Sequence, residues 1–310
     1  MDAPADQPPA VLVVGEALVD VVRSAEGAEG KEVAHPGGSP LNVAIGLARL
    51  GVPALLHTHL AEDDDGRVVL AHLAANDVPL TPTSLEPGGT TSRAVATIGA
   101  DGAATYDFAI TWAPAPLPAG LAAASRALHL GSISAYLSPG ARVVDDAVAA
   151  AAAADVPVSF DPNVRPALLG PAAEAWARVL DLARHCTIVK LSDEDADFLQ
   201  PGRDPLDVLD ELRGLGPALA VLTRGGEGLA GLVAGAAVEV SGAVVTVADT
   251  IGAGDTISAA LLARVLTHGV PADAAALRVV LEAAAEAAGV TVSRPGADPP
   301  RLAELGPAWH

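Results

Sequence analysis

Short apolar runs alternate with longer stretches of helical periodicity along most of this chain. The run VLVVG (11–15) is typical of a buried strand, because branched aliphatic residues follow one another and end at a glycine. The stretch SPLNVAIGLARLG (39–51) indicates a helix, since Ser and Pro suit its first turn and Gly suits its end. The alternation predicts an α/β fold with a central, mostly parallel sheet and helices on both faces. Further strands are expected at 52–60, 126–132, 156–163, 187–192 and 218–226, and further helices at about 64–75, after residue 132, from Asp193, within 249–266 and at about 271–288.

Two segments interrupt this alternation. Residues 16–36 and about 88–112 contain β-type runs (ALVDVV, TSRAVATIG and ATYDFAI) with turn residues between them. They predict a small antiparallel sheet, placed to act as a lid over a ligand. The chain shows no internal repeat and no linker, so 1–310 is expected to be one domain with this lid. Residues 1–9 are polar and proline-rich and are expected to form a disordered tail.

The chain is strongly acidic. Its 38 acidic residues outnumber its 18 Lys and Arg residues, which gives a formal net charge of −20. Such a surface repels nucleic acid and anionic membranes, so neither is expected as a partner. It also repels the phosphates of a nucleotide, so a phosphate site would need backbone N–H groups, a few cations and a divalent metal.

Composition also bears on the compartment. Cys186 is the only cysteine, so no intrachain disulfide is expected. The first ten residues, MDAPADQPPA, lack the basic and apolar regions of a signal peptide. Acids and arginines interrupt the alanine-rich runs, so none predicts a membrane span. These features predict a cytoplasmic protein.

The most informative stretch is DTIGAGDTISAALL, which opens with the turn Gly252-Ala253-Gly254 and continues as a helix. Glycines let the backbone approach a ligand closely, and the free N–H groups of a first helical turn bind anionic oxygens. Asp255 follows directly, and a carboxylate beside bound phosphates needs a reason. Taken alone, Asp255 is equally well interpreted as a helix cap or as a general base placed where a hydroxyl group meets a phosphate.

Both ends of the chain resemble one family. DTIGAGD resembles the C-terminal signature D-T-x-G-A-G-D of the ribokinase-like (PfkB) carbohydrate kinases, and PGGSPLNVAIGLARLG (36–51) resembles their N-terminal signature, G-G-x-x-x-N before a helix. The resemblance runs in consistent order from GEALVD to RPGADPP, and SFDPNVRPAL and KLSDED are most similar to fructokinases. It implies a ribokinase-like, Rossmann-type three-layer fold. It also implies an ATP- and Mg²⁺-dependent kinase that phosphorylates a primary hydroxyl group of a small sugar, with fructose favoured.

For the reaction itself, the resemblance implies that Gly252, Ala253 and Gly254 form an anion hole for the transferred phosphoryl group. It makes Asp255 the catalytic base.

For the sugar, the resemblance implies that Gly37 and Gly38 let the backbone lie against the substrate, while Asn42 hydrogen-bonds its hydroxyl groups. Asp20 lies in an apolar run, where it either faces water on a lid strand or accepts hydrogen bonds from the sugar. The matching aspartate of the family accepts such bonds, which favours the second interpretation.

Two arginines and the lid aromatics remain open. Arg93 and Arg165 either form surface ion pairs or clamp the substrate or the phosphates, as the arginine of D-P-N-x-R does in the family. Tyr106 and Phe108 either pack a small core within the lid, together with Trp112, or stack over the sugar and exclude water.

At the nucleotide end, VKLSDEDADFL resembles the N-x-x-E stretch, which in the family supports Mg²⁺ and the phosphates through water. Here Ser192 and Asp195 stand at the Asn and Glu positions. This departure leaves two interpretations of Asp195, a water-mediated Mg²⁺ contact or a helix cap with Ser192, and Glu194 is an alternative for the metal. Lys190 either reaches the phosphates or pairs with a neighbouring acid.

VLTRGGEGL resembles the nucleotide-lining segment of the family, so the resemblance implies nucleotide contacts for Thr223, Gly225 and Gly228. Small residues of AAAEAAGVTVSRPGADPP imply an aliphatic slot for adenine. Some relatives bind K⁺ through backbone carbonyls near the anion hole, and the candidates here are Asp249 and Ile251.

Several alternatives stay open at this point. The substrate could instead be 2-keto-3-deoxygluconate, ribose or a nucleoside, and a non-catalytic sugar-binding protein on the same fold is the rival from another class. Relatives often dimerise through the lid, so a homodimer is a further expectation. His57 and His59 are expected to be hydrogen-bonded rather than to bind zinc, because no third ligand has suitable spacing.

Overall fold

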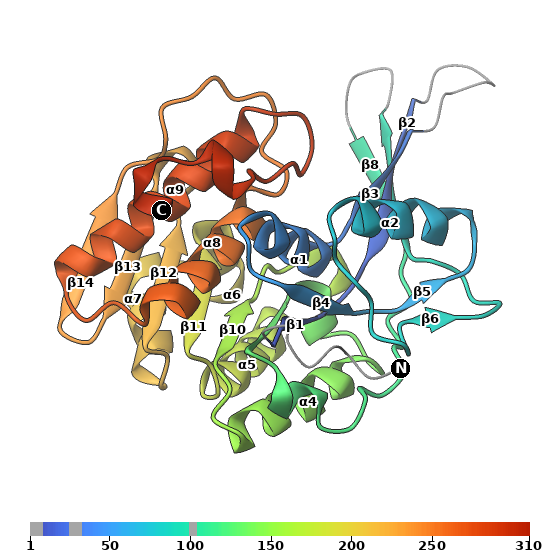
Figure 1. Cartoon of the computed structure of the whole chain (residues 1–310), viewed down its shortest axis with the longest axis horizontal. Coiled ribbons are helices and arrows are strands. Elements are labelled where there is room, and N and C mark those ends of the chain that lie inside the picture. Colours follow the sequence, from blue (N-terminus) through green and yellow to red (C-terminus); the bar gives the residue numbers. More distant parts are fainter. Residues whose placement is uncertain (1–8, 25–32, 99–103) are drawn as a thin grey trace.

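A computed structural model describes residues 9–24, 33–98 and 104–310 (Figure 1). Residues 1–8 of the expected tail at 1–9 lie outside the described residues, and so do parts of both lid segments. Among the described residues, eight strands form the large sheet in the order β14-β13-β12-β11-β10-β9-β1-β4. The strands are β1 (Val11–Val14), β4 (Ala54–His57), β9 (Ala127–Gly131), β10 (Val158–Asp161), β11 (Ile188–Ser192), β12 (Leu219–Thr223), β13 (Leu229–Val233) and β14 (Ala236–Val240).

The sheet is parallel from β4 to β12, and β13 and β14 add an antiparallel edge. The run at 11–14 is wholly apolar because both faces of β1 are covered: Val11 and Val13 face one core, and Leu12 and Val14 face the other. The predicted mostly parallel α/β fold is therefore confirmed.

Helices cover both faces of the sheet (Figure 1). One core is shared with α1 (Ser39–Arg49), α8 (Ala253–His268) and α9 (Ala274–Val292). The other is shared with α4 (Ala141–Ala153), α5 (Ala172–Ala183), α6 (Asp193–Leu199) and α7 (Pro205–Gly214). The shorter elements are α2 (Asp64–Ala75), α3 (Leu121–Ala124), β5 (Leu60–Ala61), β6 (Leu85–Glu86) and the 3₁₀ turns η1 (Ser132–Ala135), η2 (Pro166–Leu168), η3 (Gly225–Glu227), η4 (Leu302–Glu304) and η5 (Pro307–Trp309).

A second, four-stranded sheet stands out from the main body beside α2 (Figure 1). Its order is β3-β2-β7-β8, and its outer pairs are antiparallel while β2 and β7 run parallel to each other. The strands come from both predicted lid segments: β2 (Leu18–Ser24), β3 (Val33–Gly37), β7 (Arg93–Ile98) and β8 (Ala104–Ala109). Because β2 follows β1 after a short turn, the small sheet lies next to the carboxyl end of β1.

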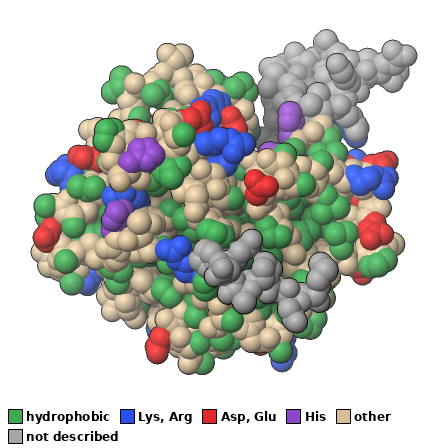
Figure 2. Space-filling view, in the orientation of Figure 1, with side chains coloured by type: hydrophobic (Ala, Val, Ile, Leu, Met, Phe, Trp, Pro, Cys, Tyr) green, Lys and Arg blue, Asp and Glu red, His purple; other side chains and the backbone are tan. Residues whose placement is uncertain are grey.

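None of the helices in the described part of the chain is long and apolar enough to cross a bilayer. On the face that Figure 2 shows, basic side chains lie in separate small groups among apolar and neutral surface.

Candidate active site

A cavity of about 800 Å³ lies at the carboxyl ends of the parallel strands. This is the edge where α/β sheets bind ligands. One end is lined by residues after β1, from the lid and after β10, and the other by residues after β11 and β12 and from α9. Because three strands separate β1 from β12 in the sheet, the cavity is long enough to hold two ligands side by side. The first turn of α8 contributes Gly252, Ala253, Gly254 and Asp255 to the same lining.

The Asp255 carboxylate is buried and held from two directions. Ser39 donates its hydroxyl hydrogen to Oδ1 at 2.6 Å, and Asn42 donates its amide to Oδ2 at 2.8 Å. Both donors lie in the first turn of α1, which packs against α8. Each oxygen is thereby fixed in orientation, and the group faces the cavity rather than capping its own helix. No side-chain cap is present at the start of α8.

The turn before Asp255 requires glycine. Gly252 has a φ of 77°, and a Cβ atom there would lie 2.7 Å from Cβ of Ala297. A Cβ atom on Gly254 would lie 3.1 Å from Nζ of Lys190. The backbone therefore stays bare at the start of α8, where Gly252, Ala253 and Gly254 line the cavity, and Lys190 brings a positive charge close to this turn.

Lys190 pairs with an acid, one of the two predicted roles, and its contact with phosphates stays a prediction. It lines the cavity, and its Nζ atom donates to Oδ2 of Asp161 at 2.9 Å, an oxygen that also accepts the Ser258 hydroxyl at 2.9 Å. Burial alone would lower the pKa of Lys190, but the carboxylates of Asp161, Asp195 and Asp255 outweigh it and raise that pKa. Lys190 is thus held as a cation beneath the turn at 252–254.

The predicted sugar residues lie around the other end. A Cβ atom on Gly37 would lie 2.0 Å from Oδ2 of Asp20, and one on Gly38 would lie 2.5 Å from the Glu16 carbonyl oxygen, at a φ of 109°. Partial desolvation raises the pKa of Asp20, although Arg165 and His35 pull it down. Gly38, Asp20 and Arg165 line the cavity, whereas Gly37 is buried behind Asp20.

Of Arg93 and the lid aromatics Phe108 and Trp112, only Phe108 lines the cavity. Arg93 pairs with Asp65 through two hydrogen bonds and is outside the cavity lining, so the structure supports the ion-pair interpretation and not a substrate clamp. Phe108 lines the cavity from the lid. Trp112 is buried below it and donates Nε1–H to the Ser134 carbonyl. Tyr106 belongs to β8, but its side chain lies outside the described residues.

Asp195 is engaged by the backbone. Its Oδ1 accepts the Val164 N–H at 2.8 Å and its Oδ2 accepts the Ser192 N–H at 3.0 Å, while the Ser192 hydroxyl caps α6 in return. Asp195 does not line the cavity, but Ser192, Asp193 and Glu194 do. These bonds favour the capping interpretation of Asp195, its water-mediated metal contact stays a prediction, and Glu194 is the neighbouring acid that lines the cavity.

Asp249 is likewise tied to the backbone. It accepts the N–H groups of Ile251 at 3.0 Å and Gly296 at 2.9 Å, and these bonds lower its pKa. These two hydrogen bonds thus join the loop before α8 to the turn after α9. A monovalent cation at Asp249 and Ile251 stays a prediction.

The nucleotide end is shaped by glycine turns and aliphatic side chains. Thr223, Gly225 and Gly228 line the cavity, and a Cβ atom on Gly228 would lie 2.0 Å from the Val240 carbonyl oxygen. Opposite them lie small or branched aliphatic residues: Val245, Val247, Ala285, Ala288, Gly289 and Val292. This composition matches the expected aliphatic slot for a flat base.

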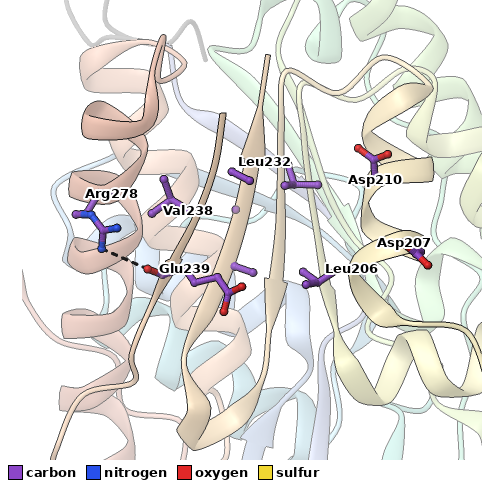
Figure 3. Close-up of a pocket in the computed structure, with 10 residues that line it drawn as sticks. Leu206, Asp207, Asp210, Leu232, Val238, Glu239 and Arg278 are labelled. Carbon is purple, nitrogen blue, oxygen red and sulfur yellow. Dashed lines mark hydrogen bonds between the residues drawn. The ribbon is translucent and has the colours of Figure 1, made fainter. Parts of the chain in front are cut away.

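A second hollow, of about 540 Å³, lies at the antiparallel edge between α7, β13, β14 and α9 (Figure 3). At one side Arg278 of α9 donates to the Glu239 carbonyl of β14 at 3.3 Å, and Asp207 and Asp210 of α7 line the other side (Figure 3). It shares no residue with the larger cavity, and its lining includes no glycine turn at a helix start.

Three functional candidates were not apparent from the sequence. Glu16 lines the sugar end, Ser39 holds Asp255, and Asp161 holds Lys190. Each of the three residues lies within a recognised motif, GEALVD, GGSPLN or DPNVR, and this position was the only sign of a role that the sequence offered. His57 and His59 are hydrogen-bonded, to Thr81 and Ala115 and to Thr111 and Glu86 respectively, and the described residues contain no group of three or more His, Cys, Asp or Glu suited to a metal.

Comparison with known proteins agrees with this geometry. Residues 9–303 match the pfkB family of carbohydrate kinases, and the chain belongs to this family. It is 36% identical over 264 residues to a fructokinase of Rhizobium leguminosarum bv. trifolii, covering 82% of this chain and 78% of the relative. It is 31% identical over 282 residues to a fructokinase of Klebsiella pneumoniae, covering 86% and 88%. The crystal structure of a fructokinase from Xylella fastidiosa with bound ATP superposes with a TM-score of 0.79 at 25% identity, covering 93% of each chain.

Proposed function

We propose that this protein is an ATP-dependent kinase that phosphorylates a primary hydroxyl group of fructose. The observation that carries the proposal is the placement of Asp255 beside the bare first turn of α8, between the two ends of one cavity. A general base, an anion hole and room for two ligands are what phosphoryl transfer to an alcohol requires. The names of the relatives favour fructose among the sugars.

In the proposed reaction, Asp255 accepts the proton of the sugar hydroxyl group as its oxygen attacks the γ-phosphate of ATP in line. Ser39 and Asn42 keep the carboxylate in position, so little reorganisation is needed at that step. The amides of 252–254 and the Lys190 ammonium face the charge that spreads over the transferring group. Sugar contacts by Asp20, Gly38, Asn42 and Arg165, and nucleotide contacts by Ser192, Thr223, Gly225 and Gly228, belong to this proposal.

The residues at the nucleotide end fit a Mg²⁺ ion that ATP brings with it. Mg²⁺ keeps several waters and usually takes only one or two protein carboxylates, and Glu194 and Asp193 are the acids that line this end. When bound with ATP, the ion would neutralise part of the negative charge of the phosphates.

The small sheet supplies the lid of the proposed enzyme. Leu18, Ala94, Phe108 and Ile110 present apolar groups to the cavity from β2, β7, β8 and the segment after β8. Excluding water above the sugar would protect ATP from hydrolysis. Dimerisation through this sheet stays a prediction. The unpaired edges of its outer strands β3 and β8, within the described residues, would be suited to it.

A panel of neutral sugars, sugar acids and nucleosides tests the substrate. With MgATP, fructose is expected to give the highest kcat/KM, and the product is expected to carry its phosphate on a primary hydroxyl group. Coupled detection of ADP measures the rates, and ³¹P NMR locates the phosphate. A sugar acid, ribose or a nucleoside turned over far better than fructose would refute the substrate assignment. Tight fructose binding without any turnover would point to the non-catalytic alternative.

The Ser39→Ala variant tests the positioning of the base. Loss of one hydrogen bond to Asp255 is expected to lower kcat about tenfold while the KM for ATP stays near its normal value. The conservative variant Ser39→Thr keeps a hydroxyl donor and should retain most of the kcat, which a loss of packing alone would not explain. Ser241→Ala, at an exposed position distant in the chain, is the matched control. An unchanged kcat in Ser39→Ala would contradict this role.

A further inference from the structure

Glu16 is a buried carboxyl group that the proposed mechanism does not use. It lies in the turn between β1 and β2, is 4% exposed, and lines the sugar end of the cavity. Its Oε2 atom accepts the Ser134 N–H at 3.2 Å, and the Ser132 hydroxyl and its own N–H are further donors to the carboxylate. A carboxylate has about four acceptor positions, so these donors leave capacity for a ligand hydroxyl group.

The charges around Glu16 are unbalanced. The acids that line the sugar end are Glu16, Asp20 and Asp255, and the cations that line the cavity are Arg165 and Lys190, of which Lys190 is already paired with Asp161. Arg165 donates through Nη1 to Asn163 and to the Val164 carbonyl, so part of its hydrogen-bonding capacity is already used. Such a site accepts hydroxyl hydrogens well and repels a substrate carboxylate or phosphate.

Resting on the proposed function, we propose that Glu16 is a second carboxylate acceptor for the sugar and restricts this end of the cavity to neutral polyhydroxy substrates. Its position beside Gly38 supports this role: Gly38 lines the cavity and, having no side chain, packs directly against the Glu16 backbone, so it forms part of the cavity floor next to Glu16. A sugar that lies on this floor comes within reach of both Asp20 and Glu16. Two carboxylates can then accept hydroxyl groups on different carbons, which selects for the arrangement of those groups.

The role has a consequence for protons. Burial raises the pKa of Glu16 to about 7, more than its hydrogen bonds and Arg165 lower it. Hydroxyl donors of a bound sugar favour the ionised form, so sugar binding lowers this pKa and releases a proton near neutral pH. Sugar affinity should therefore weaken as the pH falls below about 7. The other charged groups near this end are Arg165, Asp20, Asp255 and Lys190, which is paired with Asp161, and His35 on β3 acts on Asp20.

Isothermal titration calorimetry of fructose binding measures the proton directly. Titrations at pH 7 in two buffers with different ionisation enthalpies, with a non-hydrolysable ATP analogue present, give the number of protons released. The wild-type protein is expected to release a substantial fraction of one proton. Glu16→Gln should abolish this release and raise the KM for fructose about tenfold, with a smaller change in kcat. Glu174→Gln, at an exposed position in the first turn of α5, is the matched control, and Asp20→Asn should weaken binding while the release persists.

Selectivity provides the second readout. Glu16→Gln should raise kcat/KM for 2-keto-3-deoxygluconate relative to fructose about tenfold, because one repelling charge is removed. Thermal unfolding reports whether the variant folds, and the wild-type titration stands without any variant. Fructose binding without proton release in the wild type, or with equal release in Glu16→Gln, would overturn the inference. Failure of every sugar to bind or react would refute the proposed function and this inference with it.

Discussion

The Asp255→Ala variant is expected to phosphorylate fructose about 10³-fold more slowly than the wild type. Without the carboxylate, the attacking hydroxyl group has no proton acceptor at the point where α8 begins. Fructose binding should change little by comparison, since Asp20, Asn42 and Arg165 remain. Single-turnover kinetics measure the loss, and calorimetry of fructose binding separates it from affinity.

The variant also tests whether Asp255 has only a structural role. Removing it leaves the Ser39 hydroxyl and the Asn42 amide without their buried acceptor, so some loss of stability is expected, of about 1–3 kcal/mol for each donor. Asp273→Ala is the matched control, because Asp273 caps the start of the neighbouring helix α9 and does not line the cavity. It should lose about 1 kcal/mol of stability with normal kcat. Near-normal turnover in Asp255→Ala would refute the assignment of the base.

The sequence predicts those elements whose signals are local. The helix expected at about 64–75 is α2, because Asp63 caps it and the apolar positions Val69 and Leu73 recur at helical spacing. Strand β1 was recognisable because it is buried on both faces and carries no polar residue. The hairpin β13–β14 had no such signal: its alanines and glycines fit several structures, and in the fold it pairs with β12 and packs against α9, which is distant in the sequence.

The candidate site was predictable residue by residue but not as a set of contacts. Motifs placed Asp255, Asn42 and Lys190 in one site, yet Asn42 holds the base in the structure, and its predicted sugar contact stays a prediction. Such roles depend on hydrogen bonds between residues far apart in the chain, such as those from Ser39 to Asp255 and from Arg93 to Asp65. The capping role of Asp195 was one of two local alternatives, and the position of Val164 supports it. Burial, which sets the pKa of Glu16, is a property of the folded chain.

The buried pair of Lys190 and Asp161 links stability to chemistry. Asp161 is 1% exposed, and its Oδ1 atom has no partner within the described residues. Burial raises its pKa to about 6 even with Lys190 beside it. Without the ammonium group, this carboxyl would be still harder to ionise, so Lys190 is needed to keep the pair charged at neutral pH.

Lys190→Met is therefore expected to lower the free energy of unfolding by about 3–5 kcal/mol, because it leaves a buried carboxylate without a cation. The loss should be larger at pH 8 than at pH 5.5, since a protonated Asp161 needs no partner and its folded-state pKa lies above the unfolded value of 3.8. The kcat should fall about 10²-fold as well, because a charge beside the turn at 252–254 is gone. Urea unfolding at the two pH values and steady-state kinetics measure the two effects.

The double variant Lys190→Met/Asp161→Leu separates these effects. Replacing a buried ion pair by apolar side chains is often neutral for stability, so the double variant should regain most of the lost stability. Its kcat should stay low, since Leu and Met supply no charge to the transferring phosphoryl group. Recovery of kcat together with stability would show that Lys190 acts only by neutralising Asp161, and the anion hole would then consist of the α8 amides alone.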